Sequence, residues 1–205
     1  MMIALRHFVS DTRGTAAEFA LVLPAFLILL FATIDVGRFM WFLGQAEKAT
    51  MQGARYAAVT DMVPSDLADY SFATTGGVPQ GDAVPQTQFP GVSCSSSQGT
   101  VSCVCLSGGT CAFGLTANDT AFTNIATVMR QMYGGIGKDN VRVDYTYSGL
   151  GFAGNPNGPD VDPIITVSLQ NMQFRPLLLG TLGAIGLPGT SHSLTQEDGV
   201  GDFSF

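Results

Sequence analysis

Charge is scarce in this chain, and histidine is scarcer still. Only 12% of the 205 residues are charged, about half the usual share, and the formal net charge is −7. The chain holds two histidines, and it contains no G-x-S-x-G, H-E-x-x-H or P-loop sequence. An acidic chain without a basic patch does not fit nucleic-acid binding, and a hydrophobic share of 46% argues against disorder. We therefore expect a folded, non-enzymatic protein without a cofactor.

Long apolar runs are also few, and one of them alone could cross a membrane. Residues 19–34 read FALVLPAFLILLFATI without a charge, and residues 39–43 (FMWFL) resume the run after Asp35 and Arg38. A helix through both stretches exceeds the ~20 residues that span a hydrocarbon core. Asp35 and Arg38 are three positions apart and share a helix face, so their charges can neutralise one another. We expect one membrane span at about residues 19–43.

The helical pattern continues beyond the apolar run. Small side chains recur at Ala46, Ala49, Gly53 and Ala57, a spacing that lets another backbone approach closely. One helix over about residues 15–60 would be roughly 65–70 Å long, which exceeds the thickness of a membrane. Its second half is therefore expected to pack on the soluble domain or on other subunits. A cleaved secretory signal fits less well, because no A-x-A-like site follows the apolar run.

Four cysteines cluster in one loop, residues 94–111: Cys94, Cys103, Cys105 and Cys111. An even number of clustered cysteines favours two disulfides in an oxidising compartment. Of the three possible pairings, the one that joins Cys103 to Cys105 closes a very small ring and is the least favoured. Free thiols and a zinc site are the alternatives, although the C-x8-C-x-C-x5-C spacing lacks the paired C-x-x-C knuckles of zinc sites. Disulfides would place this domain outside the cytoplasm and the N-terminus inside.

Within residues 61–205, one segment has the apolar spacing of an α-helix. It covers residues 120–133, with Asp119 as its N-cap and Gly134-Gly135 at its end. The apolar face that we expect to be buried consists of Phe122, Ile125, Val128 or Met129, and Met132.

Two segments of the same domain read as strands. Residues 140–148 alternate strictly between apolar and polar side chains, as in a half-buried strand, and residues 164–173 form a second strand. We expect the two to pair antiparallel, and residues 63–114 to form long loops with short strands. The predicted fold class is α+β, with a long N-terminal membrane-spanning helix packed on a small antiparallel-sheet domain.

An oxygen-rich loop and a lone histidine are the remaining candidates for chemistry. The loop GNPNGPDVDP carries Asn155, Asn157, Asp160 and Asp162. Calcium favours such ligands, but the spacing is not that of an EF-hand and the same residues are common in turns, so we favour a turn. His192 is interpreted as an incidental surface residue. No metal site and no catalytic residue is predicted.

Three stretches near the N-terminus form a recognisable pattern: RGTAAEFALVLP at residues 13–24, IDVGR at residues 34–38 and GARYAA at residues 53–58. Their order and spacing resemble the TadE-like family, pilin-like proteins of the Tad (Flp, tight-adherence) pilus systems. The resemblance covers about residues 11–60. A weaker similarity lies near the C-terminus, where an FRP-L-L-like element (residues 174–179) precedes a final strand at residues 191–195.

The resemblance implies a prepilin-type leader, residues 1–14, that a membrane aspartic peptidase removes after Gly14 on the cytoplasmic side. Thr15 would then be the first mature residue and Glu18 the fourth, whereas a glutamate is usually fifth in the family. Either the peptidase tolerates the shorter spacing, or the protein is retained uncut. Glu18 has two interpretations: a carboxylate that complements the helix dipole, or an assembly residue that pairs with the free amine of a neighbouring subunit.

The function that these features predict is that of a minor pilin or pseudopilin, a single-pass protein of the inner (cytoplasmic) membrane. Residues 61–205 would be periplasmic or extracellular. The implied partners are the membrane, other pilin-like subunits, the pilus assembly machinery and, for processing, a prepilin peptidase. The alternative is a membrane-anchored extracytoplasmic binding module, including one that binds calcium, with no role in a polymer.

Overall fold

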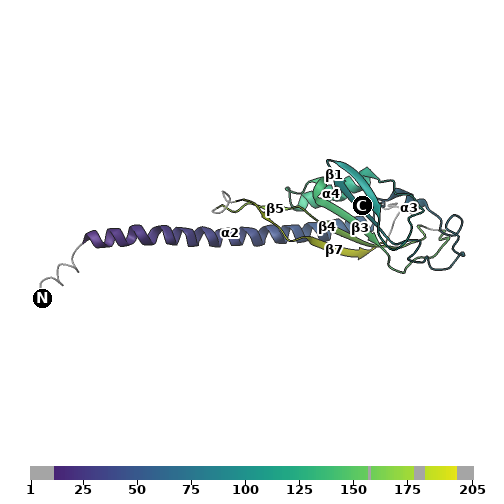
Figure 1. The fold of residues 1–205 in the computed structure, drawn as a ribbon, viewed down its shortest axis with the longest axis horizontal. Coiled ribbons are helices and arrows are strands. Elements are labelled where there is room, and N and C mark those ends of the chain that lie inside the picture. The colour runs from purple at the N-terminus through teal and green to yellow at the C-terminus, as the bar shows by residue number, and fades with distance from the viewer. Residues whose placement is uncertain (1–11, 157, 178–182, 198–205) are drawn as a thin grey trace. The chain divides into compact units, whose positions relative to one another are not determined.

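The computed structural model describes residues 12–156, 158–177 and 183–197, with side chains from residue 18 onward. The chain divides into two compact units. The first unit contains the residues up to Phe42 together with Gln173–Ile185. The second contains Leu43–Met172 and the residues from Gly186 onward. The predicted α+β class is confirmed, because a long helix is combined with an antiparallel sheet (Figure 1).

The long helix, α2 (Thr12–Ala58), contributes to both units. Every side chain from Glu18 to Ile34 is exposed, and this stretch contains Phe, Leu, Ile and Val at most positions. Within the described part of the chain, α2 is the one helix that is long and apolar enough to cross a membrane. The helix begins three residues before the predicted start and ends two residues before the predicted end. Such differences are common at frayed helix ends.

The second unit is built on a five-stranded antiparallel sheet with the order β2-β1-β3-β4-β7. The strands are β1 (Val92–Ser97), β2 (Thr100–Cys105), β3 (Val141–Thr146), β4 (Ile164–Leu169) and β7 (Thr190–Thr195). Two short strands, β5 (Gln173–Phe174) and β6 (Ile185–Gly186), form a separate pair. The remaining elements are α3 (Ser65–Asp69), α4 (Asp119–Met132) and the 3-10 turn η1 (Lys138–Asn140).

The predicted antiparallel pairing of β3 with β4 is confirmed, with Val143 opposite Val167. Alternate side chains of both strands are buried, which gives the sheet one core face and one face toward solvent. The core side of β3 consists of Val141, Val143 and Tyr145, none of which is accessible.

The β1–β2 hairpin turns through two residues, Gln98 and Gly99, which both have positive φ. Positive φ at both central positions is the mark of the type I′ turn, whose twist matches that of the flanking strands. Glycine adopts this conformation without strain, whereas Gln98 is one of two non-glycine residues with positive φ among those described.

The second half of α2 packs on the sheet within the second unit, as the small-residue pattern predicted. The stripe and its neighbours are buried: Ala46, Ala49, Thr50, Gly53, Ala54, Ala57 and Ala58. A Cβ added at Gly53 would lie 2.7 Å from Cγ of Met129 on α4 and 3.2 Å from Cγ1 of Val167 on β4. The glycine therefore permits close approach of the helix to both elements.

Three details of the predicted helix at residues 120–133 are wrong. The N-cap is Asn118, whose side-chain oxygen accepts the N–H of Ala121 at 3.0 Å, and Asp119 begins the first turn instead. Both residue types cap helices well, so the sequence alone did not separate them. At the other end, Met132 is 40% exposed, because the buried face of the helix runs through Ala126 and Met129 instead.

The helix also does not end through a left-handed glycine. Tyr133 follows Met132 in an extended conformation, and its N–H bonds to the carbonyl of Met129. Gly135 is required for space rather than for positive φ, because a Cβ there would collide with the ring of Tyr133.

Candidate functional site

The residues of the predicted processing site lie in the first turns of α2. Gly14 and Thr15 belong to the helical backbone, and Glu18 follows one turn later with an exposed side chain. The predicted leader falls mainly on residues 1–11, which lie outside the described residues, as do the side chains of residues 12–17. The structure thus gives Glu18 no partner within its own described chain, and its carboxylate is open to other molecules.

Farther along the helix, Asp35 is held from two directions. Arg38 donates to its Oδ1 at 3.1 Å, which confirms that these two residues share a face and pair. The backbone N–H of Leu177 donates to the same oxygen at 2.9 Å, across 142 positions of sequence. The side chain of Asp35 is only 11% exposed. A cation and an amide dipole therefore both help to compensate this carboxylate on an apolar helix.

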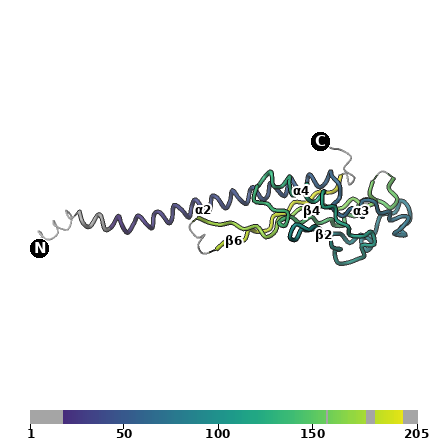
Figure 2. Tube along the Cα trace, turned by 90° about the horizontal axis from the view of Figure 1, so that it is seen from above, coloured from purple at the N-terminus to yellow at the C-terminus, as the bar shows by residue number. Residues whose placement is uncertain are grey.

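The segment that supplies Leu177 is anchored to α2 by aromatic packing. The ring of Phe174 meets Phe39 edge-on at 5.5 Å and Phe42 at 6.0 Å between centroids. The guanidinium carbon of Arg38 lies 5.4 Å from the Phe174 ring centre, within cation–π range. Figures 1 and 2 show β5 and β6 running alongside α2. The sequence indicated an element at residues 174–179 but gave no sign that it returns to the helix.

A groove of about 330 Å³ opens between this segment and α2 within the first unit. Its lining is almost entirely apolar: Ala32, Asp35, Val36, Phe39, Phe174, Pro176 and Ile185. Asp35 contributes little polarity, because its carboxylate is already bonded to Arg38 and Leu177. The groove suits a hydrocarbon occupant rather than a polar ligand.

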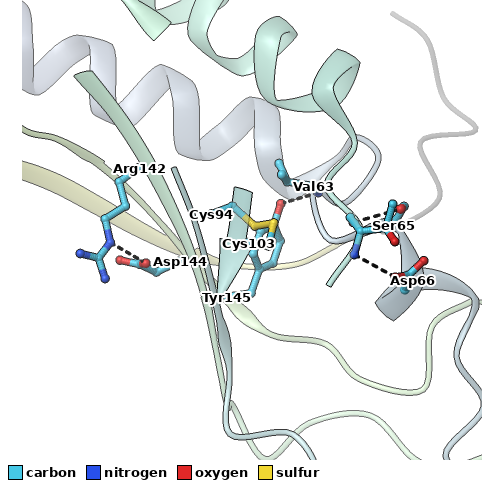
Figure 3. Close-up of a disulfide and its surroundings, with 9 residues drawn as sticks. Val63, Ser65, Asp66, Cys94, Cys103, Arg142, Asp144 and Tyr145 are labelled. Atoms are coloured by element: carbon cyan, nitrogen blue, oxygen red, sulfur yellow. Dashed lines mark hydrogen bonds and ion pairs between the residues drawn. A yellow bond between two sulfur atoms is a disulfide. The ribbon is translucent and has the colours of Figure 1, made fainter. Parts of the chain in front are cut away.

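The four cysteines lie in the second unit and form two disulfides in the structure. Cys94 pairs with Cys103, its direct cross-strand neighbour on β1 and β2, and Cys105 pairs with Cys111 in the following loop. Figure 3 shows the first bridge beside Tyr145, on the core side of the sheet. Cys94 is fully buried and Cys103 is 8% exposed. With every sulfur engaged, the cysteines are structural rather than reactive.

The oxygen-rich loop is organised by Asp160. Its Oδ2 accepts the N–H of Phe72 at 2.7 Å, and its Oδ1 accepts the N–H of Asn155 at 2.9 Å. Asp160 is only 4% exposed. Both oxygens are thus used for backbone amides, which supports the turn interpretation. Among the residues that the structure describes, no group of three His, Cys, Asp or Glu side chains is placed to hold a metal ion.

His192 lies in β7, within the predicted final strand. It lines an open groove of about 650 Å³ in the second unit, together with Glu47 and Lys48 of α2. His192 is opposite the buried Val167 in the sheet, so the two residues lie on the same face of the sheet, the one toward the core.

The groups with shifted pKa values do not lie together at one site. A hydrogen bond from Lys138 lowers the pKa of Asp119, and a hydrogen bond from Ser96 lowers that of Asp139. Burial raises the pKa of Asp162 and of Tyr145. Because each of these shifts has a local structural cause, they describe ion pairs, turns and core packing rather than a catalytic cluster.

Comparison with known protein families gives a match within α2. No curated protein and no solved structure matches the chain. Residues 14–55 match the model of the family described as TadE-like protein. This stretch begins at Gly14, contains Glu18 and the Asp35–Arg38 pair, and ends within the buried small-residue stripe. The match confirms the resemblance to the TadE-like family over most of α2.

Proposed function

We propose that the chain is a minor pilin or pseudopilin, a single-pass membrane subunit of a Tad pilus assembly system. The position of the TadE-like match, over residues 14–55 of α2, supports this proposal most directly. The matched residues begin with an exposed apolar stretch that can cross a membrane, and they end in a small-residue face that is buried in the second unit. An anchor continuous with a domain-packing helix suits a subunit that is held in the membrane until it is assembled.

The proposed location is the inner membrane, with residues 61–205 on the periplasmic or extracellular side. Two disulfides in the second unit support this orientation, because thiols stay reduced in the cytoplasm of most cells. Other pilin-like subunits and the assembly machinery are the proposed partners.

Leader removal after Gly14 by a prepilin peptidase is the processing step of this proposal. Intact-mass analysis of the protein recovered from membranes should find Thr15 at the N-terminus. A Gly14→Val variant should accumulate at the precursor mass, because the added branched side chain hinders close approach of the enzyme to the backbone. Gly37→Val is the matched control, since a Cβ at Gly37 meets nothing within 4 Å. An unprocessed parent protein in cells with an active peptidase would contradict this step.

Glu18 is proposed to act in assembly. Once the leader is removed, the ammonium of Thr15 and the carboxylate of Glu18 lie within one helical turn at the membrane edge. Each can pair with its counterpart on an adjacent helix, which offsets the cost of holding a charge there. A role restricted to the helix dipole would be worth only about 0.3–1 kcal/mol.

The Glu18→Gln variant separates the two interpretations, because it keeps the shape of the side chain and removes its charge. It should insert and be processed like the parent but fail to co-purify partner pilins or to support piliation. Glu47→Gln is the matched control, since Glu47 is an exposed glutamate on the same helix. If the Glu18→Gln protein still recovers partners and forms pili at the parental level, the assembly role is wrong.

A further inference from the structure

The segment that carries β5 advances along α2 toward its apolar half. Phe174 contacts α2 at Phe39 and Phe42, whereas Leu177, three residues later, reaches Asp35. The segment therefore runs antiparallel to the helix and moves closer to the membrane-spanning stretch at each residue.

Two large apolar side chains of this region are held in place but are not covered. Leu177 is fixed through its backbone to Asp35, and its residue is 64% exposed. Ile185 lines the apolar groove and is 48% exposed. In water, exposing two such side chains beside an apolar groove is unfavourable.

The groove is continuous with the lipid-facing surface of α2. Ala32 and Val36 line the groove, and Ile28 and Leu29, one turn before Ala32 on the same helix face, are 55% and 65% exposed. The medium that covers the apolar span can therefore cover the groove without a break.

Charges set the depth at which this region lies. Glu18 and Arg38 are twenty positions apart on α2, which corresponds to about 30 Å, the thickness of a hydrocarbon core. Asp35, and with it Leu177, is one turn inside that boundary, by roughly 4–5 Å. Arg38 and Arg175 are exposed on the outer side, at the level where arginine side chains reach phosphate headgroups.

We infer that the segment around β5 and β6 is a second membrane-contacting element of this protein. Leu177 and Ile185 lie in the outer acyl-chain layer beside α2, and a lipid acyl chain fills the groove. The ion pair with Arg38 and the hydrogen bond from Leu177 together compensate the charge of Asp35, which would otherwise oppose burial in lipid. This inference rests on the proposed membrane span of α2, and its test separates the two.

Tryptophan fluorescence in lipid vesicles tests the inference, because the chain has a single tryptophan, Trp41. In a Trp41→Phe background, the full chain carries one new tryptophan at Leu177, a site exposed enough to accept it. The protein is reconstituted in phosphatidylcholine and phosphatidylglycerol vesicles whose acyl chains are brominated either near the headgroup or near the chain end. Emission from Leu177→Trp should fall roughly twofold with the headgroup-proximal bromines and less with the distal ones. Ile185→Trp should behave in the same way.

Two controls set the scale. Ile28→Trp, in the middle of the exposed apolar stretch, should be quenched most by the distal bromines, and Val104→Trp on β2 of the second unit should respond only to aqueous acrylamide. If Ile28→Trp is quenched while Leu177→Trp and Ile185→Trp behave like Val104→Trp, the inference is overturned and the membrane span stands. If Ile28→Trp is not quenched either, both fail. Shielding of Leu177→Trp from brominated lipid and acrylamide alike would assign the groove to a protein partner and overturn the lipid assignment.

Discussion

The phenolic oxygen of Tyr145 accepts the backbone N–H of Val63 at 3.0 Å. Tyr145 lies fully buried on the central strand β3, and Val63 belongs to the segment that leaves α2 (Figure 3). The two residues are 82 positions apart. This one bond therefore fixes the exit of the long helix to the middle of the sheet.

Replacing Tyr145 with Phe should lower the free energy of unfolding by about 1–3 kcal/mol, because it leaves the buried N–H of Val63 without an acceptor. Thermal unfolding of the detergent-solubilised chain measures the loss. Tyr147→Phe is the control at a half-buried site just after the same strand, and it should change stability by about 0.5 kcal/mol or less. Equal losses in the two variants would contradict a special role for the Val63 bond.

Tyr145 also predicts a response to alkaline pH. Burial raises the pKa of its hydroxyl well above the ordinary value of 10. The unfolded chain therefore releases this proton at a lower pH than the folded chain does. The contribution of this protonated hydroxyl to the free energy of unfolding is fully present below about pH 10. It is lost as the pH rises further. Between about pH 9 and 11, the melting temperature of Tyr145→Phe should therefore decline less steeply than that of the parent. Burial also raises the pKa of Tyr133, but Tyr133 titrates in both proteins and does not affect the comparison.

Gly53 and Gly44 should respond in opposite ways to the same substitution. Gly53→Ala places a methyl group against Met129 and Val167, and overpacking of this kind costs about 1–3 kcal/mol, partly offset by a gain in helix propensity of about 1 kcal/mol. A Cβ at Gly44 meets nothing within 4 Å, so Gly44→Ala should keep the gain alone. Gly53→Val should unfold at a clearly lower temperature than Gly53→Ala. A Gly53→Val protein as stable as the parent would show that the helix is not tightly packed here.

Asp139 should govern stability in acid. The hydroxyl of Ser96 donates to its Oδ1, and the N–H of Gly99 donates to the same oxygen at 3.0 Å. The carboxylate therefore holds the turn of the β1–β2 hairpin in place. These bonds hold the pKa of Asp139 below its ordinary value of 3.8. The stability they contribute is present above that value and is lost as the pH falls through the lower pKa of the folded state.

The Asp139→Asn variant should therefore melt at a lower temperature near neutral pH and show a flatter decline below about pH 4. Hydrogen exchange at the Gly99 amide should become faster in the variant. Asp82→Asn, which removes an exposed loop carboxylate, controls for the change in net charge. Unchanged exchange at Gly99 would show that the carboxylate does not hold the turn.

The two disulfides should differ in their contribution to stability. Both close short loops, with sequence separations of 9 and 6, so each should contribute near the lower end of the usual range of about 2–4 kcal/mol. Cys94→Ala with Cys103→Ala should cost more than Cys105→Ala with Cys111→Ala, because the first pair also removes buried sulfur from the core. Non-reducing mass analysis of the parent should find no free thiol, and four free thiols would refute the pairing.

Local periodicity carried most of the fold prediction. The apolar run and the small-residue stripe lie in α2, and the alternation of residues 141–146 lies in β3. Each pattern is set within a few adjacent residues, and both elements are present. The antiparallel partner of β3 followed from the next strand along the chain.

Contacts between distant parts of the chain had no such signal. The insertion of β1 between β2 and β3 pairs residues such as Val92 and Tyr145, which are far apart in the sequence. The bond from Ser96 to Asp139 spans 43 positions. The return of Phe174 and Leu177 to α2 depends on a contact across 142 positions. A single backbone N–H, such as that of Leu177, has no residue-type signature at all, so its role at Asp35 could only be found in three dimensions.

The bond between Asp35 and Leu177 also sets an order of events during synthesis. A ribosome adds about 5–20 residues per second, so roughly 7–28 s separate translation of Asp35 from that of Leu177. Throughout that interval the nascent chain can pair Asp35 with Arg38 but not with the N–H of Leu177. If α2 is inserted during synthesis, as the proposed function implies, Asp35 enters the membrane with Arg38 beside it and gains the hydrogen bond from Leu177 only afterwards.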